Sequence, residues 1–295
     1  MSVAIIGPDV EARLDWLGLC DAIEAGHARS RAEIADSFLY RGTDTLLSRA
    51  AWIDGLGQLV KTATIFPGNA AVGKPAVNGS AALYSDTDGT LAAIVDFHLL
   101  TKWKTAGDSL CAARLLARKD SAVILIVGAG TVAAALRAAY GALFPDARFL
   151  VWNRTRAGAE RLAARFAGTT VADDLPAAVA GADIVTCATM ATDPVLRGEW
   201  LRPGQHVDLI GAYRPDMREA DDAALRRARI FVDSRATTIG HIGELKIPLA
   251  RGVITEGDVL ADYYDLPSGA FARRSDDEIT LFKNGGGAHL DLMTA

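Results

Sequence analysis

The spacing of the hydrophobic residues changes at about residue 121, and this change divides the chain into two regions. Within the first forty residues, apolar positions recur at helical spacing with charged residues between them, which predicts a helical start. Residues 43–95 contain short apolar runs separated by turn-forming stretches, which predicts a largely antiparallel sheet of hairpins, and a helix is predicted over 105–118. The helical pattern at the start consists of Val10, Leu14, Leu17 and Ile23.

From Ser121 onward, continuous apolar runs alternate with helical patterns. Ala122–Val127 and Arg148–Trp152 are typical of strands buried on both faces. Helices are predicted from Thr131 and over Thr155–Phe166, so the alternation indicates right-handed βαβ units in a parallel sheet. Three later strands are predicted at Ala182–Ala188, His206–Gly211 and Arg229–Asp233.

These patterns predict an α/β protein of two domains. Residues 118–275 are assigned to a doubly wound, nucleotide-binding domain, and residues 1–117 with 276–295 to a second domain. The last twenty residues join the N-terminal region because they are too few to form a core of their own.

The composition is that of a folded globular protein. Half of the 295 residues are hydrophobic and 23% are charged, which excludes intrinsic disorder, collagen and coiled coil. The net charge of −5 argues against a nucleic-acid partner. Cys20, Cys111 and Cys187 are far apart and match no zinc spacing, so no metal is predicted and a reducing compartment is expected.

Neither a targeting nor a spanning segment is predicted. The first residues, MSVAIIGPDVEARLDW, lack the basic region of a signal peptide. The most apolar stretch, residues 122–136, is shorter than the roughly 20 residues that span a bilayer. We therefore expect a cytoplasmic protein without a membrane partner.

A glycine-rich turn follows the first strand of the second region. Gly128, Gly130 and Ala133 form the pattern G-x-G-x-x-A between a predicted strand and a predicted helix. This pattern permits a tight turn, a close approach of the backbone to a pyrophosphate, and close packing of helix on strand. The helix N-terminus then offers N–H groups to the phosphates. The residues assigned to the cofactor here are Gly128, Ala129, Gly130, Thr131 and Val132.

The end of the second strand indicates which dinucleotide is bound. A site for NAD usually places a carboxylate there to accept bonds from the ribose hydroxyls. This chain has Asn153-Arg154-Thr155-Arg156 instead, which offers an amide, a hydroxyl and two guanidinium groups. Because arginine makes charge-assisted forked bonds to phosphate, the sequence predicts NADP(H). Thr189 and Met190, after the predicted strand at 182–188, are also assigned to the cofactor.

Four sets of segments together resemble a known family. They are VKTATIFPGN at 60–69, LTKWKTAG at 100–107, the Gly128 loop with WNRT at 152–155, and a set between 191 and 234 that includes GAYRPD at 211–216. The chain resembles the ornithine cyclodeaminase/mu-crystallin family over nearly its whole length, most closely its ketimine-reductase members. The resemblance implies a Rossmann domain, an α+β substrate and dimerisation domain built from both chain ends, and a homodimer.

The resemblance also implies which residues hold the substrate. The family binds the α-carboxylate of a small amino or imino acid through cationic side chains, which correspond here to Arg41, Lys61 and Lys104. Arg49 remains an alternative to Arg41. Lys61 and Lys104 are the catalytic candidates, with Lys61 as a possible proton source, and Tyr213 is assigned to the substrate pocket.

Two departures from the family pattern bear on the reaction. Lys104 stands where the family commonly has arginine, so the charge is kept but the bidentate fork is lost. Tyr213 stands where cyclodeaminases carry a catalytic aspartate, and a phenol with a pKa of about 10 is a poor base at neutral pH. Cyclodeaminase activity is therefore disfavoured.

The expected activity is the NADPH-dependent reduction of a cyclic ketimine, Δ1-pyrroline-2-carboxylate or Δ1-piperideine-2-carboxylate, to a proline- or pipecolate-like product. Two alternatives stay open: an amino-acid or opine-type dehydrogenase, and a non-catalytic NADPH- or ligand-binding protein. Outside this set, His206 is interpreted as structural. Glu219 and Asp221 are interpreted as acids at a helix start, which complement its dipole.

Overall fold

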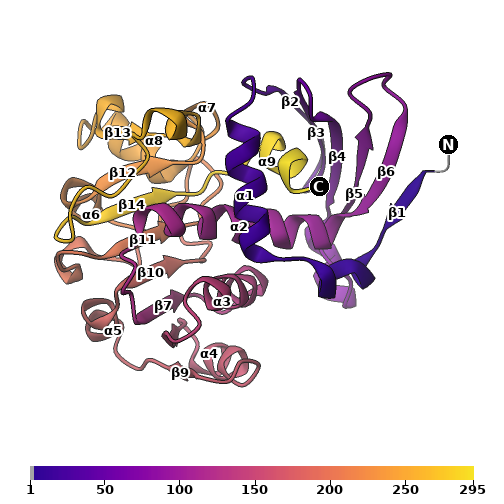
Figure 1. The fold of residues 1–295 in the computed structure, drawn as a ribbon. Helices are drawn as coiled ribbons and strands as arrows, with labels where there is room; N and C mark the ends of the chain where they lie inside the picture. The colour runs from indigo at the N-terminus through magenta and orange to yellow at the C-terminus, as the bar shows by residue number, and fades with distance from the viewer. Residues whose placement is uncertain (1–2) are drawn as a thin grey trace. The chain divides into compact units, whose positions relative to one another are not determined.

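A computed structural model describes residues 3–295, which form two compact units (Figure 1). Met1 and Ser2, which the sequence analysis included in the first domain, lie outside the described residues. The mixed-sheet unit contains the chain up to Lys104 together with Gly287–Ala295, and the parallel-sheet unit contains Thr105–Gly286. A unit built from both chain ends and a separate doubly wound unit were the predicted architecture.

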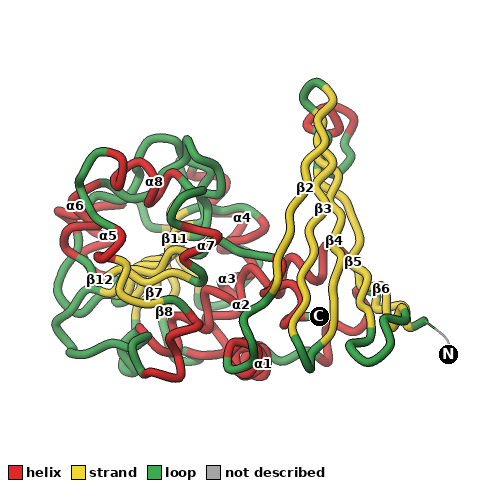
Figure 2. The backbone as a smooth tube through the Cα atoms, turned by 90° about the horizontal axis from the view of Figure 1, so that it is seen from above, coloured by secondary structure: helices red, strands yellow, loops and turns green. Residues whose placement is uncertain are grey.

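The mixed-sheet unit is built on six strands in the order β1-β6-β5-β4-β3-β2. Strands β2 to β6 pair antiparallel with their neighbours, and β1 adds parallel to β6. The long neighbouring strands β2 to β5 are prominent in Figure 2. The strands are β1 Ala4–Ile6, β2 Glu33–Arg41, β3 Asp44–Ile53, β4 Gly57–Ile65, β5 Val77–Tyr84 and β6 Leu91–Asp96. The helical segments are η1 Pro8–Arg13, α1 Trp16–His27, η2 Pro67–Val72 and α9 Ala288–Thr294.

The predicted helical start is correct only within η1 and α1, because Ala4–Ile6 before them forms strand β1. Asp15 caps α1 by accepting hydrogen bonds from the backbone N–H groups of Leu17 and Gly18. Residues 33–41 instead form β2, an edge strand whose nine residues are all exposed. Because this segment buries no helical face, its pairing with β3 decides its structure.

One face of the mixed sheet is covered by the last helix of the chain. Leu59, Lys61 and Ala63 on β4 are buried, whereas Val60 between them is exposed, as expected for side chains that alternate across a strand. Helix α9 contacts β3, β4 and α1 on the buried side. The residues on this side of the sheet are called the inner face below.

The parallel-sheet unit has eight strands in the order β13-β12-β14-β11-β10-β7-β8-β9, and all of their pairings are parallel. The strands are β7 Val123–Val127, β8 Arg148–Trp152, β9 Thr169–Val171, β10 Ile184–Cys187, β11 His206–Leu209, β12 Arg229–Val232, β13 Val259–Ala261 and β14 Thr280–Lys283. The α-helices are α2 Phe97–Leu116, which begins in the mixed-sheet unit, α3 Thr131–Leu143, α4 Arg156–Ala163, α5 Leu175–Gly181, α6 Asp222–Arg227, α7 Arg235–Thr238 and α8 Gly243–Ala250. The 3-10 helices are η3 Gly198–Trp200, η4 Glu256–Asp258 and η5 Tyr263–Ser268.

The unit boundaries differ from the assignment made on sequence, which placed them at 117/118 and 275/276. The structure divides the chain after Lys104 and again after Gly286. Residues 280–283 form β14, which lies between β11 and β12 in the parallel sheet and is buried at every position. A four-residue strand inserted from the end of the chain leaves no alternating strand and helix pattern, so no local pattern predicts it.

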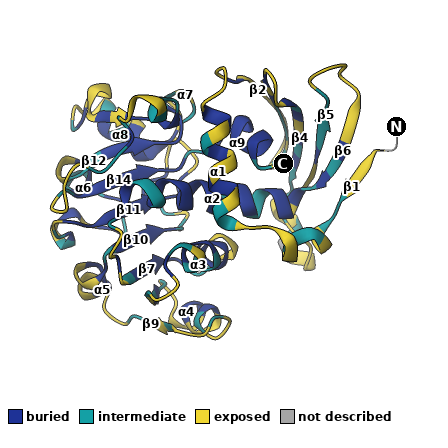
Figure 3. Ribbon diagram, in the orientation of Figure 1, coloured by how far each residue is buried: buried dark blue, intermediate teal, exposed yellow. Residues whose placement is uncertain are grey.

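The core of the parallel-sheet unit is formed by its central strands. Strands β10 and β11 are buried at all four positions, and Figure 3 shows the central strands in dark blue. Burial of each Val, Leu or Ile side chain contributes about 1.5–3 kcal/mol to folding. None of the helices within residues 3–295 has the length and hydropathy that crossing a bilayer requires.

Candidate functional site

The carboxyl ends of β7, β8, β10 and β11 lie along one edge of the parallel sheet. Strand β7 pairs with β8 on one side and with β10 on the other, so the chain order reverses between β7 and β10. Ligands of doubly wound sheets bind at the carboxyl edge beside such a reversal. The residues predicted for the cofactor all follow these strands: the Gly128 loop follows β7, Asn153 follows β8, and Thr189 follows β10.

The glycine loop has the backbone that a pyrophosphate site needs. Gly128 has a φ of 112°, and a Cβ atom there would lie 2.6 Å from the carbonyl oxygen of Ala188. Gly130 is the N-cap of α3, and a Cβ atom there would meet no heavy atom of the described chain within 4 Å. Thr131 and Val132 are exposed in the first turn of this 13-residue helix. The N-terminus of α3 therefore opens onto free space, which fits a bound phosphate.

The polar residues after β8 differ in what they are free to bind. The Asn153 side chain donates to the backbone oxygen and the hydroxyl of Thr155, both at 2.9 Å, and so shapes the turn. Arg156 pairs with Glu160 at 2.8 Å and with Asp173. Arg154 is exposed in the same turn. Of the two guanidinium groups predicted for this site, that of Arg156 is therefore already paired with carboxylates, whereas that of Arg154 is exposed.

A buried carboxylate joins the ends of β10 and β11. Glu219 Oε1 accepts from the Thr189 backbone N–H at 2.6 Å and from its hydroxyl at 2.7 Å. Glu219 Oε2 accepts from the backbone N–H groups of Gly211 at 2.6 Å and Ala212 at 3.3 Å. A Cβ atom at Gly211 would lie 1.7 Å from the Thr189 carbonyl oxygen, so only glycine fits where the two strand ends approach. Glu219 thus clamps together two loops that follow neighbouring strands.

This position of Glu219 corrects its interpretation from sequence. Asp221 is the N-cap of α6, as an acid at a helix start should be, and accepts from Ala224 N at 2.9 Å. Glu219 is fully buried instead, and burial raises its pKa to about 8 against the opposing effect of Lys283. Glu244 anchors the same segment by accepting from the backbone N–H groups of Glu219 and Ala220. Because Glu219 stands only two residues before the N-cap of α6, its local sequence resembles that of an acid at a helix start.

Tyr213 lies in the loop that follows β11 and is 60% exposed. Its neighbour Arg214 pairs with Asp216 at 2.7 Å, and the Arg214 carbonyl accepts from Gly243 N at 3.0 Å. Met190, in the loop after β10, is exposed as well. Tyr213 is therefore an accessible side chain at the carboxyl edge. Its loop is held in place by the hydrogen bonds of Glu219 to Gly211 and Ala212 and by the bond from Gly243 N to the Arg214 carbonyl.

The mixed-sheet unit holds a buried cluster of cations. Lys61 on β4 is only 6% exposed, and its Nζ donates to Asp291 Oδ1 on α9 at 2.7 Å. The ammonium also lies over the Phe97 ring, 4.9 Å from its centroid. Lys104 on α2 is buried nearby, and its charge lowers the pKa of Lys61 in addition to the larger effect of burial. The structure therefore brings the two predicted catalytic lysines into one environment.

Arg49, not Arg41, belongs to this cluster. Arg49 is the cross-strand partner of Lys61 in the register of β3 and β4. It pairs with Asp36 on β2 at 2.7 Å and lies 3.9 Å from Asp291. Arg41 is 80% exposed and pairs with Asp44 at 3.0 Å across the β2–β3 turn. Because Asp36 shares the inner face with Lys61, strand alternation turns Arg41 toward the opposite face. We call Lys61, Lys104 and Arg49 the cation cluster.

Asp291 and Glu219 are the two residues of these sites whose contacts the sequence did not reveal. Asp291 is separated from Lys61 by 230 positions, so no spacing could join them. His98 is exposed in the first turn of α2 and lies outside the cation cluster as defined above. Within residues 3–295, no three histidine, cysteine or acidic side chains converge as metal ligands.

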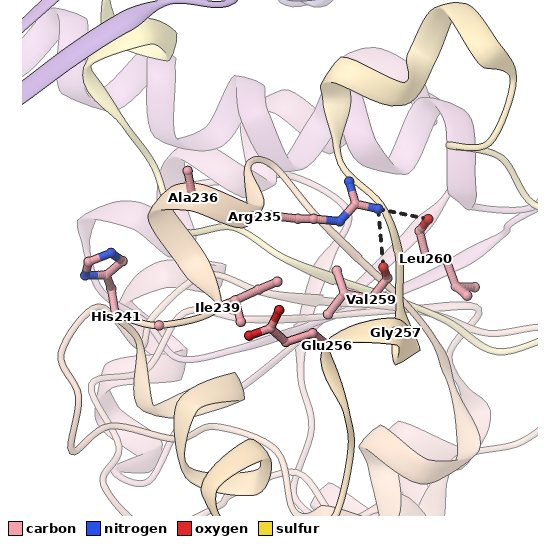
Figure 4. Close-up of a pocket in the computed structure, with 9 residues that line it drawn as sticks. Arg235, Ala236, Ile239, His241, Glu256, Gly257, Val259 and Leu260 are labelled. Atoms are coloured by element: carbon pink, nitrogen blue, oxygen red, sulfur yellow. Dashed lines mark hydrogen bonds between the residues drawn. The ribbon is translucent and has the colours of Figure 1, made fainter.

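The parallel-sheet unit also has a pocket near the end of β12, with a volume of about 760 Å3 (Figure 4). Its one arginine, Arg235, donates to the backbone oxygens of Val259 at 3.4 Å and Leu260 at 3.1 Å, and pairs with Asp265 at 2.6 Å. None of the residues predicted for substrate or cofactor lines this pocket.

Comparison with known families and structures shows which protein family the chain belongs to. The family model described as the ornithine cyclodeaminase/mu-crystallin family matches residues 54–295. The chain belongs to this family. It is 55% identical to the Delta(1)-pyrroline-2-carboxylate reductase of Paracoccus denitrificans over 293 residues, which cover 97% of this chain and 93% of the relative. It is 34% identical to the ketimine reductase mu-crystallin of Mus musculus over 236 residues, which cover 80% and 73% of the two chains.

The fold is also that of a solved member of this group. The structure of Thermococcus litoralis Delta(1)-pyrroline-2-carboxylate reductase in complex with NADH and L-proline superposes with a TM-score of 0.91. The match covers 99% of this chain and 95% of the other, at 26% sequence identity. The predicted family and fold class are therefore confirmed.

Proposed function

We propose that this protein is a reductase that uses a nicotinamide cofactor, preferentially NADPH, to reduce Δ1-pyrroline-2-carboxylate or Δ1-piperideine-2-carboxylate to L-proline or L-pipecolate. The observation that carries the proposal is the buried cation cluster in a chain of this family. Two cations on the inner face of the sheet and one on α2 face two carboxylates, those of Asp291 and Asp36, so the cluster keeps an excess positive charge that an α-carboxylate ligand would offset.

The cation cluster supplies two kinds of contact to a carboxylate. Arg49 offers a planar fork for a bidentate pair, and Lys61 and Lys104 offer point charges. We assign the predicted arginine contact to Arg49 because Arg41 lies on the other face of the sheet. Anchoring through the carboxylate orients the ring so that C2 is held for reaction.

The ring nitrogen of the imine is already protonated when the reaction begins, so the reaction needs one hydride at C2 and one further proton at the nitrogen. Bound nicotinamide cofactor supplies the hydride, which forms the new C–H bond at C2 as the C=N π pair becomes a nitrogen lone pair. That nitrogen then takes a proton to become the ammonium of the product. Lys61 is the assigned proton source, because burial lowers its pKa and so makes its ammonium a better donor than an exposed lysine.

The preference for NADPH rests on the turn after β8. Arg154 is exposed there, and no carboxylate stands between Trp152 and Arg156 to favour a ribose hydroxyl. Gly128, Gly130 and the N-terminus of α3 suit the pyrophosphate of either dinucleotide. The cofactor assignment therefore covers the Gly128 loop, the Asn153–Thr155 turn and the Thr189–Met190 segment.

A homodimer is proposed through the outer face of the mixed sheet, opposite the cation cluster. Large apolar side chains are exposed on that face of neighbouring strands. By alternation from Lys61 and its cross-strand partners they share one side: Leu39, Leu46, Trp52 and Val60. Sedimentation velocity of the full chain tests this assignment, with a single species of about 62 kDa expected, twice the chain mass of 31.1 kDa.

The deciding experiment follows NADPH oxidation by the purified protein with each of the two ketimines in turn, and with NADH in parallel. NADPH-dependent turnover of either ketimine supports the proposal, and the faster ring identifies the preferred substrate. Turnover that is faster with NADH refutes the cofactor preference. Cofactor binding without turnover of either ketimine refutes the proposed reaction and favours an acyclic imine, an amine substrate or a non-catalytic binding role.

A further inference from the structure

The C-terminal helix α9 provides the charged partner of Lys61. Asp291 on α9 is fully buried, and its Oδ1 accepts the 2.7 Å hydrogen bond from Lys61 Nζ. Nothing in the sequence pattern or in the resemblance assigns this aspartate a role. A buried carboxylate carries a large desolvation cost, which a charged partner or several hydrogen-bond donors must offset, and the partner of Asp291 is the ammonium of Lys61.

The second oxygen of Asp291 points to the rest of the cluster. Asp291 Oδ2 lies 3.9 Å from Arg49 Nη1 and accepts no hydrogen bond from residues 3–295. One carboxylate thus bridges two cations that are cross-strand partners on β3 and β4. Without it, Lys61 would face Lys104 and Arg49 with no acidic group on α9 to offset their repulsion.

We propose that Asp291 is the positioning residue of Lys61. Its carboxylate fixes the ammonium on the inner face of β4 and keeps that lysine charged beside two other cations, while the remaining N–H bonds of Nζ stay available to the substrate. This inference rests on the proposed function, because it assigns Lys61 to the carboxylate and proton chemistry of the reaction.

The electrostatic surroundings of Lys61 agree with this role. Burial, Lys104 and Arg49 lower the pKa of Lys61, and only Asp291 raises it. His289 does not supply a compensating charge, since burial holds its pKa well below the usual range and keeps it neutral. The charged and titratable groups around Lys61 are Asp291 and His289 on α9, Arg49 on β3, Asp36 on β2, Lys104 on α2, and, around His289, His27 on α1 and Arg31.

The test is the pH dependence of Asp291→Asn, which keeps the shape of the side chain and removes its charge. In the variant we expect kcat/KM for the preferred ketimine to match the wild type within about threefold at pH 6 and to fall at least about tenfold below it at pH 9. The basic limb of the profile moves to lower pH because Lys61 then loses its proton earlier. The imine nitrogen titrates identically with both proteins, so the ratio of the two profiles isolates the enzyme.

Three controls separate this role from simple destabilisation. Asp88→Asn removes an exposed turn aspartate of the same unit and should leave the profile unchanged. Asp291→Glu keeps the charge and should restore activity at pH 9 at least in part. Circular dichroism and thermal unfolding establish that each variant is folded at both pH values.

A second readout needs no substrate. Competitive labelling of lysines with an amine-selective reagent, followed by mass spectrometry, gives the titration of Lys61 directly. We expect Asp291→Asn to move that titration down by at least about one pH unit. Activity reduced by the same factor at every pH, together with an unmoved Lys61 titration, overturns the inference. Absence of turnover in the wild type refutes only the proposed function, and the labelling experiment then decides the role of Asp291.

Discussion

Arg49 on β3 lies directly opposite Lys61 on β4, and both side chains are on the inner face of the mixed sheet. Arg41 is eight residues earlier in the chain and, by strand alternation, on the other side of the sheet. The pairing of two strands therefore places Arg49, and not Arg41, beside Lys61, which supports Arg49 as the proposed carboxylate contact.

Replacement of Arg49 should weaken substrate binding. Arg49→Gln removes a guanidinium fork from the carboxylate site, and we expect kcat/KM for the preferred ketimine to fall about 10- to 100-fold, or about 1.4–2.8 kcal/mol. Arg41→Gln, which breaks only the exposed pair with Asp44, should change it less than about threefold. Steady-state kinetics of both variants decide the matter. A large loss in Arg41→Gln with little change in Arg49→Gln would reverse the assignment.

The turn after β8 should control the choice of dinucleotide. Arg154→Gln removes the exposed guanidinium, so we expect KM for NADPH to rise about tenfold or more while KM for NADH stays nearly constant. Arg156→Gln is the matched control, because Arg156 already pairs with Glu160 and Asp173. Equal effects of Arg154→Gln on KM for both cofactors would show that Arg154 does not bind the 2′-phosphate of NADPH.

Loss of the Glu219 clamp should affect both stability and cofactor binding. Glu219 accepts four hydrogen bonds through its two carboxylate oxygens. Glu219→Gln replaces one of these oxygens by an NH2 group, which cannot accept and would face N–H donors in the buried site. We expect the free energy of unfolding to fall by about 1–3 kcal/mol, and KM for the dinucleotide to rise because Thr189 and Met190 are no longer held. Chemical denaturation and kinetics at pH 9, above the Glu219 pKa of about 8, measure the two effects on the ionised carboxylate. Exposed Glu199→Gln should produce neither, and an unchanged Glu219→Gln variant would show that the clamp is dispensable.

His206 should make the parallel-sheet unit sensitive to acid. It is fully buried on β11, its Nδ1 lies 2.9 Å from the Thr280 hydroxyl, and burial lowers its pKa from 6.5 to about 3. Above pH 6.5 the ring is neutral in both folded and unfolded chains, so it adds no pH dependence. Below pH 6.5 the unfolded chain takes up a proton that the folded chain does not, and this lowers the free energy of unfolding by about 2 kcal/mol at pH 5.

Two histidine variants test whether the free energy of unfolding falls with pH in this way. His206→Gln should remove that part of the loss of stability between pH 6.5 and pH 5, as measured by denaturant unfolding at each pH. His98→Gln, at an exposed position, should retain the full slope. An identical slope in wild type and His206→Gln would show that His206 is not the group responsible.

Much of the parallel-sheet unit follows from sequence because its signals are local. The apolar run at 123–127, the glycine turn and the strand at 148–152 are contiguous segments whose period and turn residues specify them directly. The family motifs likewise join residues that are close in the chain, so Lys61, Lys104 and the Gly128 loop could be proposed as site residues from the sequence.

What the sequence could not decide depends on pairing between distant segments. The insertion of β14 between β11 and β12, the register that places Arg49 beside Lys61, and the contact of Asp291 with Lys61 each join residues far apart in the chain. Edge strand β2 carries no buried face, so its structure comes from β3 rather than from its own residues. Sequence by itself thus determined the family, the dinucleotide turn and most strands. Only the tertiary structure decided which charges meet, because burial and strand register bring together side chains that no local pattern connects.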